Sequence, residues 1–218
     1  TLVSFVKDST EVGKMVYSSA TNIAFGNASK GVGIGTGSVF PTNGSTAISD
    51  AGLDLGYSSS RFKDLYLSGG AYIGGTNSAN LLDDYEVGTF TPTLLGSSSN
   101  PTVSYAAQIG KYTKIGNSVI VDIYLQTNSS SGGSGNLRIA GLPFTAVSGG
   151  AESGAAPIGY NVNTGEEARV IANNNGTFCQ MLVRGGRTTS YGWANQAISA
   201  WSNSNPTALT VSFAYKTS

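Results

Sequence analysis

The stretch Val119-Ile120-Val121-Asp122-Ile123-Tyr124-Leu125 decides the fold class, because its apolar side chains recur at every second position. A β-strand sends successive side chains to opposite faces, so alternate residues from Val119 to Leu125 share one apolar face. Other segments rich in Val, Ile, Thr, Tyr and Phe lie between clusters of Gly, Asn and Ser, which is typical of many short strands and turns. The sequence therefore predicts an all-β protein.

Further strands are expected on both sides of this stretch, in the region from about residue 87 to 218. Leu209–Tyr215 alternates in the same way, and Asn175-Gly176 predicts a hairpin that joins Ala168–Ala172 to Thr177–Val183. About seven to nine strands in this region favour a β-sandwich or jelly-roll domain. We expect this domain to span residues 89–218, with polar loops at 128–135 and 184–194.

The N-terminal region contains a different pattern, Gly31-Val32-Gly33-Ile34-Gly35-Thr36-Gly37. One face of such a strand is bare backbone, while Val32, Ile34 and Thr36 occupy the other. Glycine weakens a strand unless another group must approach its backbone closely. A single chain gains little from this ribbon, whereas copies wrapped around a common axis would bury its apolar face. We therefore predict an intertwined trimeric β-stalk over residues 1–80.

Short apolar blocks that end in glycine recur in this stalk at intervals of about 20–25 residues. They are Asn22–Gly26, Arg61–Gly69 and Ala71–Gly75. At the junction, Ser78–Glu86 has the best helical pattern in the chain, with Ser78 as a possible cap and acidic residues near the start. A short helical junction is expected at residues 81–88.

The amino-acid composition argues against several classes of function. Charged residues make up 11% of the chain and the net charge is zero, which argues against nucleic acid as a partner. The absence of histidine removes the commonest general base and metal ligand. No apolar run reaches transmembrane length, so membrane insertion is not expected. The single cysteine, Cys179, is expected to be a buried free thiol.

Several motifs together resemble those of bacteriophage tail fibres. Val32–Thr36 is similar to a "VGIGT" element, and Leu53–Gly69 resembles a stalk repeat of these fibres. Leu82–Pro92 is similar to the start of a fibre tip domain, which often also contains "YTKIGN", here Tyr112–Asn117, and "GLPF", here Gly141–Phe144.

This resemblance covers about residues 26–145. It implies a homotrimer that forms the distal part of a tail fibre and is joined to upstream fibre or baseplate proteins of the virion. It also implies an extracellular role during attachment, in which the tip binds a bacterial or cyanobacterial surface glycan such as lipopolysaccharide.

A glycan-binding site is expected in the C-terminal part of the chain. Aromatic faces stack on sugar rings, and arginine forks hold carboxylate or phosphate groups. Residues 184–193 mix both types with flexible glycine. The alternative interpretation places the two tryptophans in the core or at a subunit interface. The candidate receptor-binding residues are Arg184, Arg187, Tyr191, Trp193 and Trp201.

The chain is not expected to be an enzyme, although a glycan-cleaving tailspike and a purely structural fibre segment remain as alternatives. Glycoside hydrolysis needs two carboxylates about 5–10 Å apart. The C-terminal region offers only Asp122, Glu152, Glu166 and Glu167, and the last two are adjacent. The glycine run lacks the spacing of a dinucleotide-binding loop. We expect neither a metal ion nor a cofactor, and we interpret Asp83, Asp84 and Glu86 as charges at a helix start.

Overall fold

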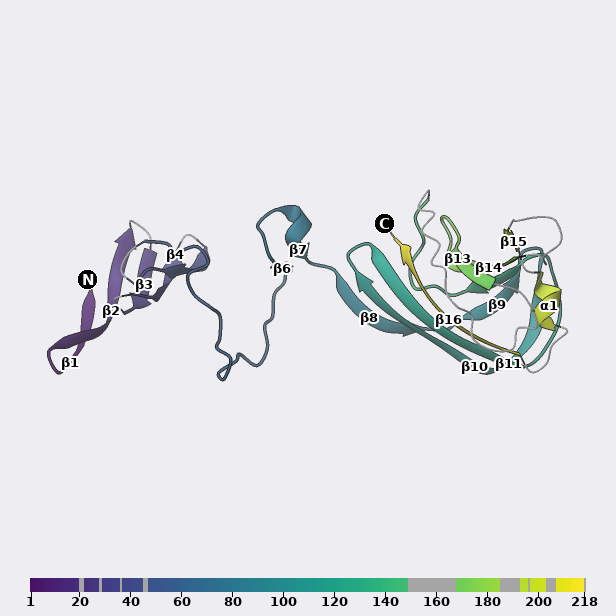
Figure 1. Cartoon of the computed structure of the whole chain (residues 1–218), viewed down its shortest axis with the longest axis horizontal. Helices are drawn as coiled ribbons and strands as arrows, with labels where there is room; N and C mark the ends of the chain where they lie inside the picture. Colours follow the sequence, from purple (N-terminus) through teal and green to yellow (C-terminus); the bar gives the residue numbers. More distant parts are fainter. Residues whose placement is uncertain are drawn as a thin grey trace. The chain divides into compact units, whose positions relative to one another are not determined.

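The structure, a computed structural model, describes residues 1–19, 22–27, 29–35, 37–44, 47–148, 168–184, 193–195, 197–202 and 207–217. These residues form antiparallel β-sheets with one 3-10 turn and one short α-helix (Figure 1). The all-β prediction is confirmed. The chain divides into two compact units, residues 1–66 and 67–218, which are described separately.

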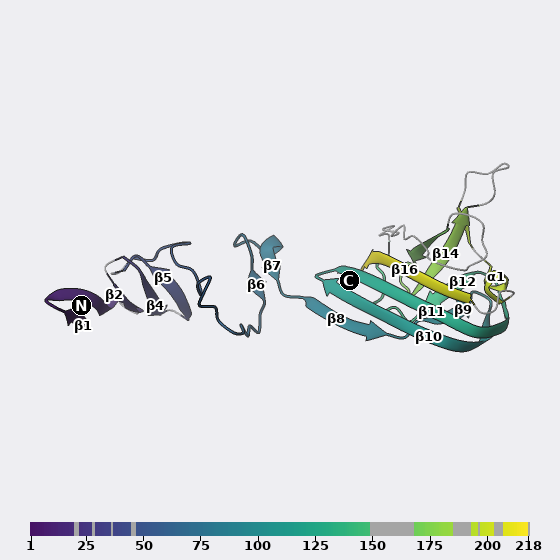
Figure 2. The ribbon, with the colours of Figure 1, turned by 60° about the horizontal axis from the view of Figure 1, so that its bottom comes forward.

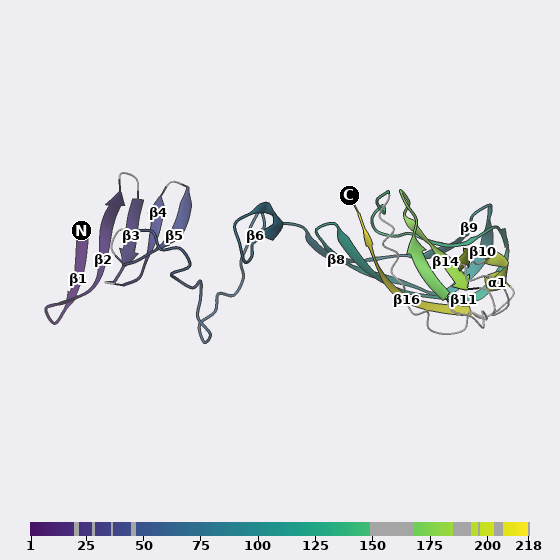
Figure 3. The ribbon, with the colours of Figure 1, turned by 45° about the horizontal axis from the view of Figure 1, so that its top comes forward.

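The first unit contains a five-stranded sheet in which each strand pairs with the next along the chain (Figure 3). The two strands expected within residues 22–26 and 31–37 are confirmed as β3 and β4, while Thr36 lies outside the described residues. The five strands are β1 (Val3–Lys7), β2 (Thr10–Ser19), β3 (Asn22–Gly26), β4 (Gly31–Gly35) and β5 (Ser38–Thr42).

The glycines of β4 let neighbouring groups lie against its backbone. Gly33 pairs with Ala24 on one side and with Phe40 on the other. A Cβ atom at Gly33 would overlap the Phe40 ring, and one at Gly35 would overlap the Asn22 side chain. The bare face of the ribbon is therefore occupied within the single chain, which explains why glycine is tolerated at these strand positions.

Residues 47–66 contain bends, turns and isolated bridges in place of a further paired strand. The block Arg61–Gly69, expected to be part of the stalk, pairs with no strand among the described residues. A tight turn closes between Tyr57 and Ser60, whose backbone groups exchange two hydrogen bonds of 3.0 and 2.9 Å.

The junction between the predicted regions differs from its expected form. The only helical turn there is a 3-10 turn at Ser78–Asn80, whose N-cap residue is Asn77, so the prediction of a helix at 81–88 is wrong. Leu81–Leu82 forms β7 and pairs with β6 (Ala71–Tyr72). Backbone pairing with another strand thus overrides the local helical preference of the leucines.

The second unit contains two larger sheets. One has the order β16-β11-β10-β8, and the other has the order β13-β14-β12-β9 with β15 added to β14. Figure 2 shows the 17-residue strands β10 and β11 running side by side. The elements are β8 (Tyr85–Phe90), β9 (Thr93–Gly96), β10 (Ser99–Ile115), β11 (Ser118–Ser134), β12 (Leu137–Ala140), β13 (Ala168–Ala172), β14 (Phe178–Arg184), β15 (Trp193–Asn195), α1 (Ile198–Ser202) and β16 (Thr207–Lys216).

One hydrophobic core receives side chains from both of these sheets and from α1. The alternation predicted for residues 119–125 is confirmed, because all four of the apolar positions named by it are buried. The fully buried large side chains of this core are Val119, Val121, Ile123, Leu125, Leu137, Ile139, Val170, Met181, Ile198, Trp201 and Leu209, and Tyr215 is 2% exposed.

The hairpin predicted at Asn175-Gly176 is confirmed. Strands β13 and β14 pair antiparallel on either side of it, and Asn175 adopts a positive φ of 55°. Gly176 N donates to Asn173 O over 3.0 Å, which closes the turn. Asparagine tolerates this left-handed conformation better than most residues, which is why the dipeptide marks such turns.

Strand pairing decides the conformation of two segments in this unit. Residues 88–94 are divided between β8 and β9, which belong to different sheets and are separated by Thr91 and Pro92. Proline has no backbone N–H to donate to a ladder. The loop expected at 128–135 is mostly strand, since β11 continues to Ser134 and pairs with β10 as far as Ser99. The pairing partner, and not the Ser/Gly composition, decides the conformation there.

Candidate interaction surfaces

One face of the sheet in the first unit carries apolar side chains on every strand. A row of residues in register runs from Val3 through Met15, Phe25 and Val32 to Pro41, and directly paired residues of antiparallel strands share a face. We call this surface the apolar sheet face. Its large exposed members are Val3, Phe5, Tyr17, Ile23, Phe25, Val32, Ile34 and Val39.

The apolar sheet face stays exposed among the described residues of the first unit. Its large members are between 37% (Val32) and 69% (Val39) exposed, whereas the buried hydrophobic residues described in this unit are Val16 and Ala24. Soluble monomers rarely expose contiguous apolar patches beyond a few hundred Å². This face is therefore the strongest candidate in the first unit for contact with another polypeptide.

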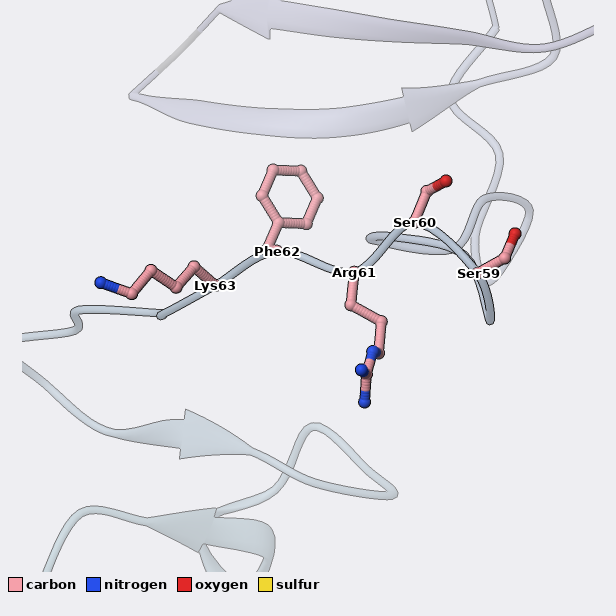
Figure 4. A pocket seen from close by; sticks show the side chains of 5 residues that line it. All are labelled: Ser59, Ser60, Arg61, Phe62 and Lys63. Carbon is pink, nitrogen blue, oxygen red and sulfur yellow. The ribbon is translucent and has the colours of Figure 1, made fainter.

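The segment that follows the sheet has uncovered apolar side chains as well. Residues 59–63 line a hollow of about 530 Å³, and Figure 4 shows Arg61 and Phe62 pointing to opposite sides of the chain. Leu55, Leu65 and Tyr66 are exposed by 75%, 67% and 89%. The hollow is open and its cations are solvated, so the arrangement offers apolar contact area more than a ligand site.

In the second unit, Trp201 does not occupy the predicted receptor-binding position. The residue is fully buried on α1, and its indole Nε1 donates a hydrogen bond to Thr127 Oγ1 over 3.2 Å. The alternative interpretation as a core residue is confirmed, and the prediction that Trp201 contacts a receptor is wrong. A short helix that covers the end of a core needs a large apolar side chain, which tryptophan supplies.

The remaining candidate residues are only partly described. Arg184 and Trp193 are cross-strand partners at the ends of β14 and β15, so the structure brings these two positions together. Both lie in strands, although a loop was expected from residue 184 to 194. Arg187 and Tyr191 lie outside the described residues. The proposal that these four residues contact a glycan stays a prediction.

Arg138 is a candidate binding residue that none of the sequence motifs indicated. It lies in β12, and its guanidinium carbon is 4.5 Å from the centroid of the Phe178 ring. Its Nε atom is buried and has no hydrogen-bond acceptor among the described residues. A signal was present in the sequence, because Leu137-Arg138-Ile139-Ala140 places a charge within an otherwise apolar strand.

Two of the acidic residues near the junction, Asp84 and Glu86, have structural partners. Asp84 forms an ion pair with Lys114, whose ammonium lies 5.5 Å from the centroid of the Phe144 ring. Glu86 accepts a hydrogen bond from Tyr112 OH, which raises the pKa of that phenol. Asp84, just before β8, and Glu86, within β8, are thereby connected to β10. The expectation that they mark a helix start is wrong, because this stretch is extended.

The carboxylates considered for glycan cleavage are mostly outside the described residues. Asp122 is described, and it accepts a hydrogen bond from Ser212 Oγ on the neighbouring strand. Glu152, Glu166 and Glu167 fall within 149–167, which the structure does not describe. Within the described ranges, no three Asp, Glu or Cys side chains come close enough together to hold a metal ion. No described helix is long and apolar enough to cross a membrane.

The cysteine is a buried thiol in the core of the second unit. Cys179 is fully buried, and its Sγ lies 3.6 Å from Ile139 O. Burial raises the pKa of its thiol to about 12. The prediction of a buried free thiol is confirmed.

Comparison with known proteins gives no further identification, since the chain matches no family model, no curated protein and no solved structure.

Proposed function

We propose that this chain is a distal segment of a bacteriophage tail fibre, which assembles as a homotrimer and attaches the virion to a bacterial or cyanobacterial surface. The observation that carries the proposal is the apolar sheet face of the first unit. Together with the exposed apolar residues of 53–66, it leaves this unit with far more uncovered than buried hydrophobic side chains. A fibre subunit has this property, because its stalk is completed only by other copies.

A second copy of the chain is the partner that best fits the apolar sheet face. The rows of residues that form the face contain no charged side chain, so a matching partner must itself be apolar. Every copy carries such a surface. Interfaces between permanently associated subunits are more apolar than transient ones, and they resemble a divided hydrophobic core.

The second unit has the properties of a tip domain. Its own core is complete, and the motifs that resemble a fibre tip, at 82–92, 112–117 and 141–144, all lie within it. It therefore folds around its own residues and is suited to present a surface to a host. In this proposal it is joined through the stalk to upstream fibre or baseplate proteins, it is extracellular during attachment, and it has no enzymatic activity.

Self-association is tested by light scattering on the purified chain and on the variant Val32→Ser/Ile34→Ser. We expect the unmodified chain to have three times the monomer mass and the variant to shift to monomer. Ile48→Ser is the matched control, since Ile48 is 66% exposed in the same unit but lies outside the apolar sheet face. A monomeric unmodified chain would contradict the proposal.

Attachment is tested with fluorescently labelled protein on a panel of bacterial and cyanobacterial strains. We expect saturable binding to at least one strain, and we expect excess unlabelled protein to block adsorption of phages that use the same receptor. Release of sugars from the surface polysaccharide would instead support a tailspike. An assembled trimer that binds no strain in a broad panel would favour a purely structural segment.

A further inference from the structure

The five-stranded sheet of the second unit has an uneven charge distribution. Strands β9, β12, β13, β14 and β15 contain no Asp or Glu, and their only charged residues are Arg138, Arg169 and Arg184. The opposite sheet mixes both signs, as Lys111 and Asp122 on paired strands illustrate. Net positive charge is thus concentrated on one sheet of a chain that is neutral as a whole.

Strand register places all three arginine positions on the same face of this sheet. Arg138 pairs with Gln180, Arg169 pairs with Leu182, and Arg184 follows Leu182 by two positions in β14. On the opposite face of β14, Cys179 and Met181 are fully buried in the core, whereas Leu182, on the same face as the arginine positions, is 7% exposed. Because alternate strand positions face opposite sides, the arginine positions belong to the outer face of the sheet.

Arg138 shows what such a position offers to a ligand. Its guanidinium lies over the Phe178 ring, and Gln180 is its cross-strand neighbour. The residue is half-buried, and no carboxylate of the described residues lies within 4.0 Å of it. A partly buried cation with an unsatisfied donor interacts more strongly with an anion than a solvated one does.

We propose that this outer face, which we call the arginine face, binds the anionic groups of an acidic glycan. The guanidinium fork matches a carboxylate or phosphate oxygen pair, the Phe178 ring packs against the Arg138 guanidinium, and the glutamine amide can bond a sugar hydroxyl. The inference rests on the proposed attachment function and specifies its ligand class. The arginine face contains the positions of Arg184 and Trp193, which the sequence already indicated, together with Arg138 and Arg169.

The test measures binding of the whole 218-residue chain to three immobilised polysaccharides: polygalacturonate, which carries carboxylates, a phosphorylated mannan, and neutral dextran. We expect binding to one or both acidic polymers, none to dextran, and weaker binding as NaCl rises from 50 to 300 mM. The polymer that binds distinguishes the carboxylate from the phosphate. Loss of one charged hydrogen bond should make Arg138→Gln bind about tenfold more weakly.

Lys111→Gln is the matched control, because it removes one positive charge from the other sheet and should retain binding. A thermal melt of each variant separates ligand contacts from stability. Equal binding to dextran, or unchanged acidic-polymer binding in both Arg138→Gln and Arg169→Gln, would overturn the inference. Cell attachment is measured in parallel. If these variants still bind cells, the proposal for the arginine face is wrong and the attachment function stands. If the chain binds acidic polymers but attaches to no cells, the attachment function is wrong and the arginine face stands.

Discussion

Trp201 Nε1 donates a hydrogen bond to Thr127 Oγ1 over 3.2 Å, and both residues are fully buried. The contact joins α1 to the long strand β11. Replacing Trp201 by alanine removes the largest buried side chain of the core and should lower the free energy of unfolding by about 3–5 kcal/mol. Urea unfolding monitored by circular dichroism measures this loss.

Thr127→Val is the companion variant to Trp201→Ala. It keeps the shape of the side chain but leaves the indole N–H without this acceptor, so we expect a loss of about 1–3 kcal/mol. If Trp201→Ala had no effect on unfolding and reduced attachment to cells, the residue would belong to a binding surface and its burial would be wrong.

The contact between Gly33 and Phe40 predicts the effect of adding a single methyl group. Gly33→Ala places a Cβ atom where the Phe40 ring lies, and overpacking of this kind typically lowers stability by about 1–3 kcal/mol. Gly69→Ala is the control, since a Cβ there meets no atom within 4 Å and its φ is not positive. Urea unfolding measures these changes, and the double variant Gly33→Ala/Phe40→Ala should lose less stability than the sum of its two single variants if the clash is the cause.

Removing one or the other partner of the Lys114–Asp84 ion pair should cause unequal losses of stability. The Lys114 side chain is 10% exposed and that of Asp84 is 44% exposed. Asp84→Asn leaves a mostly buried ammonium without its counter-ion and should lower stability by about 1–3 kcal/mol. Lys114→Met removes the charge but keeps the apolar stem beside Phe144, so we expect a smaller loss.

The double variant Asp84→Asn/Lys114→Met completes this cycle. It should be more stable than Asp84→Asn alone, because it no longer contains an uncompensated charge. A loss in the double variant equal to the sum of the two single losses, measured in urea, would mean that the pair contributes no coupling.

Deprotonation of Tyr215 should lower the stability of the fold in alkaline solution. Burial raises the pKa of its phenol to about 12, and its OH donates to Phe144 O over 3.0 Å. The folded state holds this proton more tightly than the unfolded chain, whose phenol has a pKa near 10. The contribution is complete below pH 10 and is lost as the pH rises towards 12. Burial also raises the pKa of Tyr105, so both phenols act in the same direction.

Urea midpoints at pH 8, 10 and 11 measure this effect. Tyr215→Phe should lower stability at pH 8, because it removes the hydrogen bond, and should flatten the decline between pH 10 and 11. A decline as steep as that of the unmodified chain would assign the alkaline transition to other groups.

Cys179 predicts slow chemical modification of the folded protein. Its thiol is fully buried and has a pKa of about 12, so at pH 8 very little thiolate forms and none is accessible. We expect iodoacetamide to label the folded chain far more slowly than the chain in 8 M urea. Rapid labelling of the folded chain would show that the core around β14 opens readily.

Alternation along single strands was predictable from the sequence, because the side-chain period of two is a local property of the backbone. It correctly identified the core positions from Val119 to Leu125 and the strand at Gly31–Gly35. The Asn175-Gly176 turn was predictable for the same reason, since its signal lies in the conformational preferences of two residues. The composition likewise identified a chain of strands and turns.

What the tertiary structure decided is which strands pair and which side of each one is covered. Leu81–Leu82 became a strand because Ala71–Tyr72 lies beside it, and the serine-rich end of β11 became a strand because β10 continues next to it. No local pattern contains these long-range partners. The same holds for the candidate sites: the aromatic and basic composition identified Arg184 and Trp193 but also Trp201, which the fold buries. Arg138 and Arg169 join them only through strand register, because residues far apart in the sequence share a sheet face only after the strands have paired.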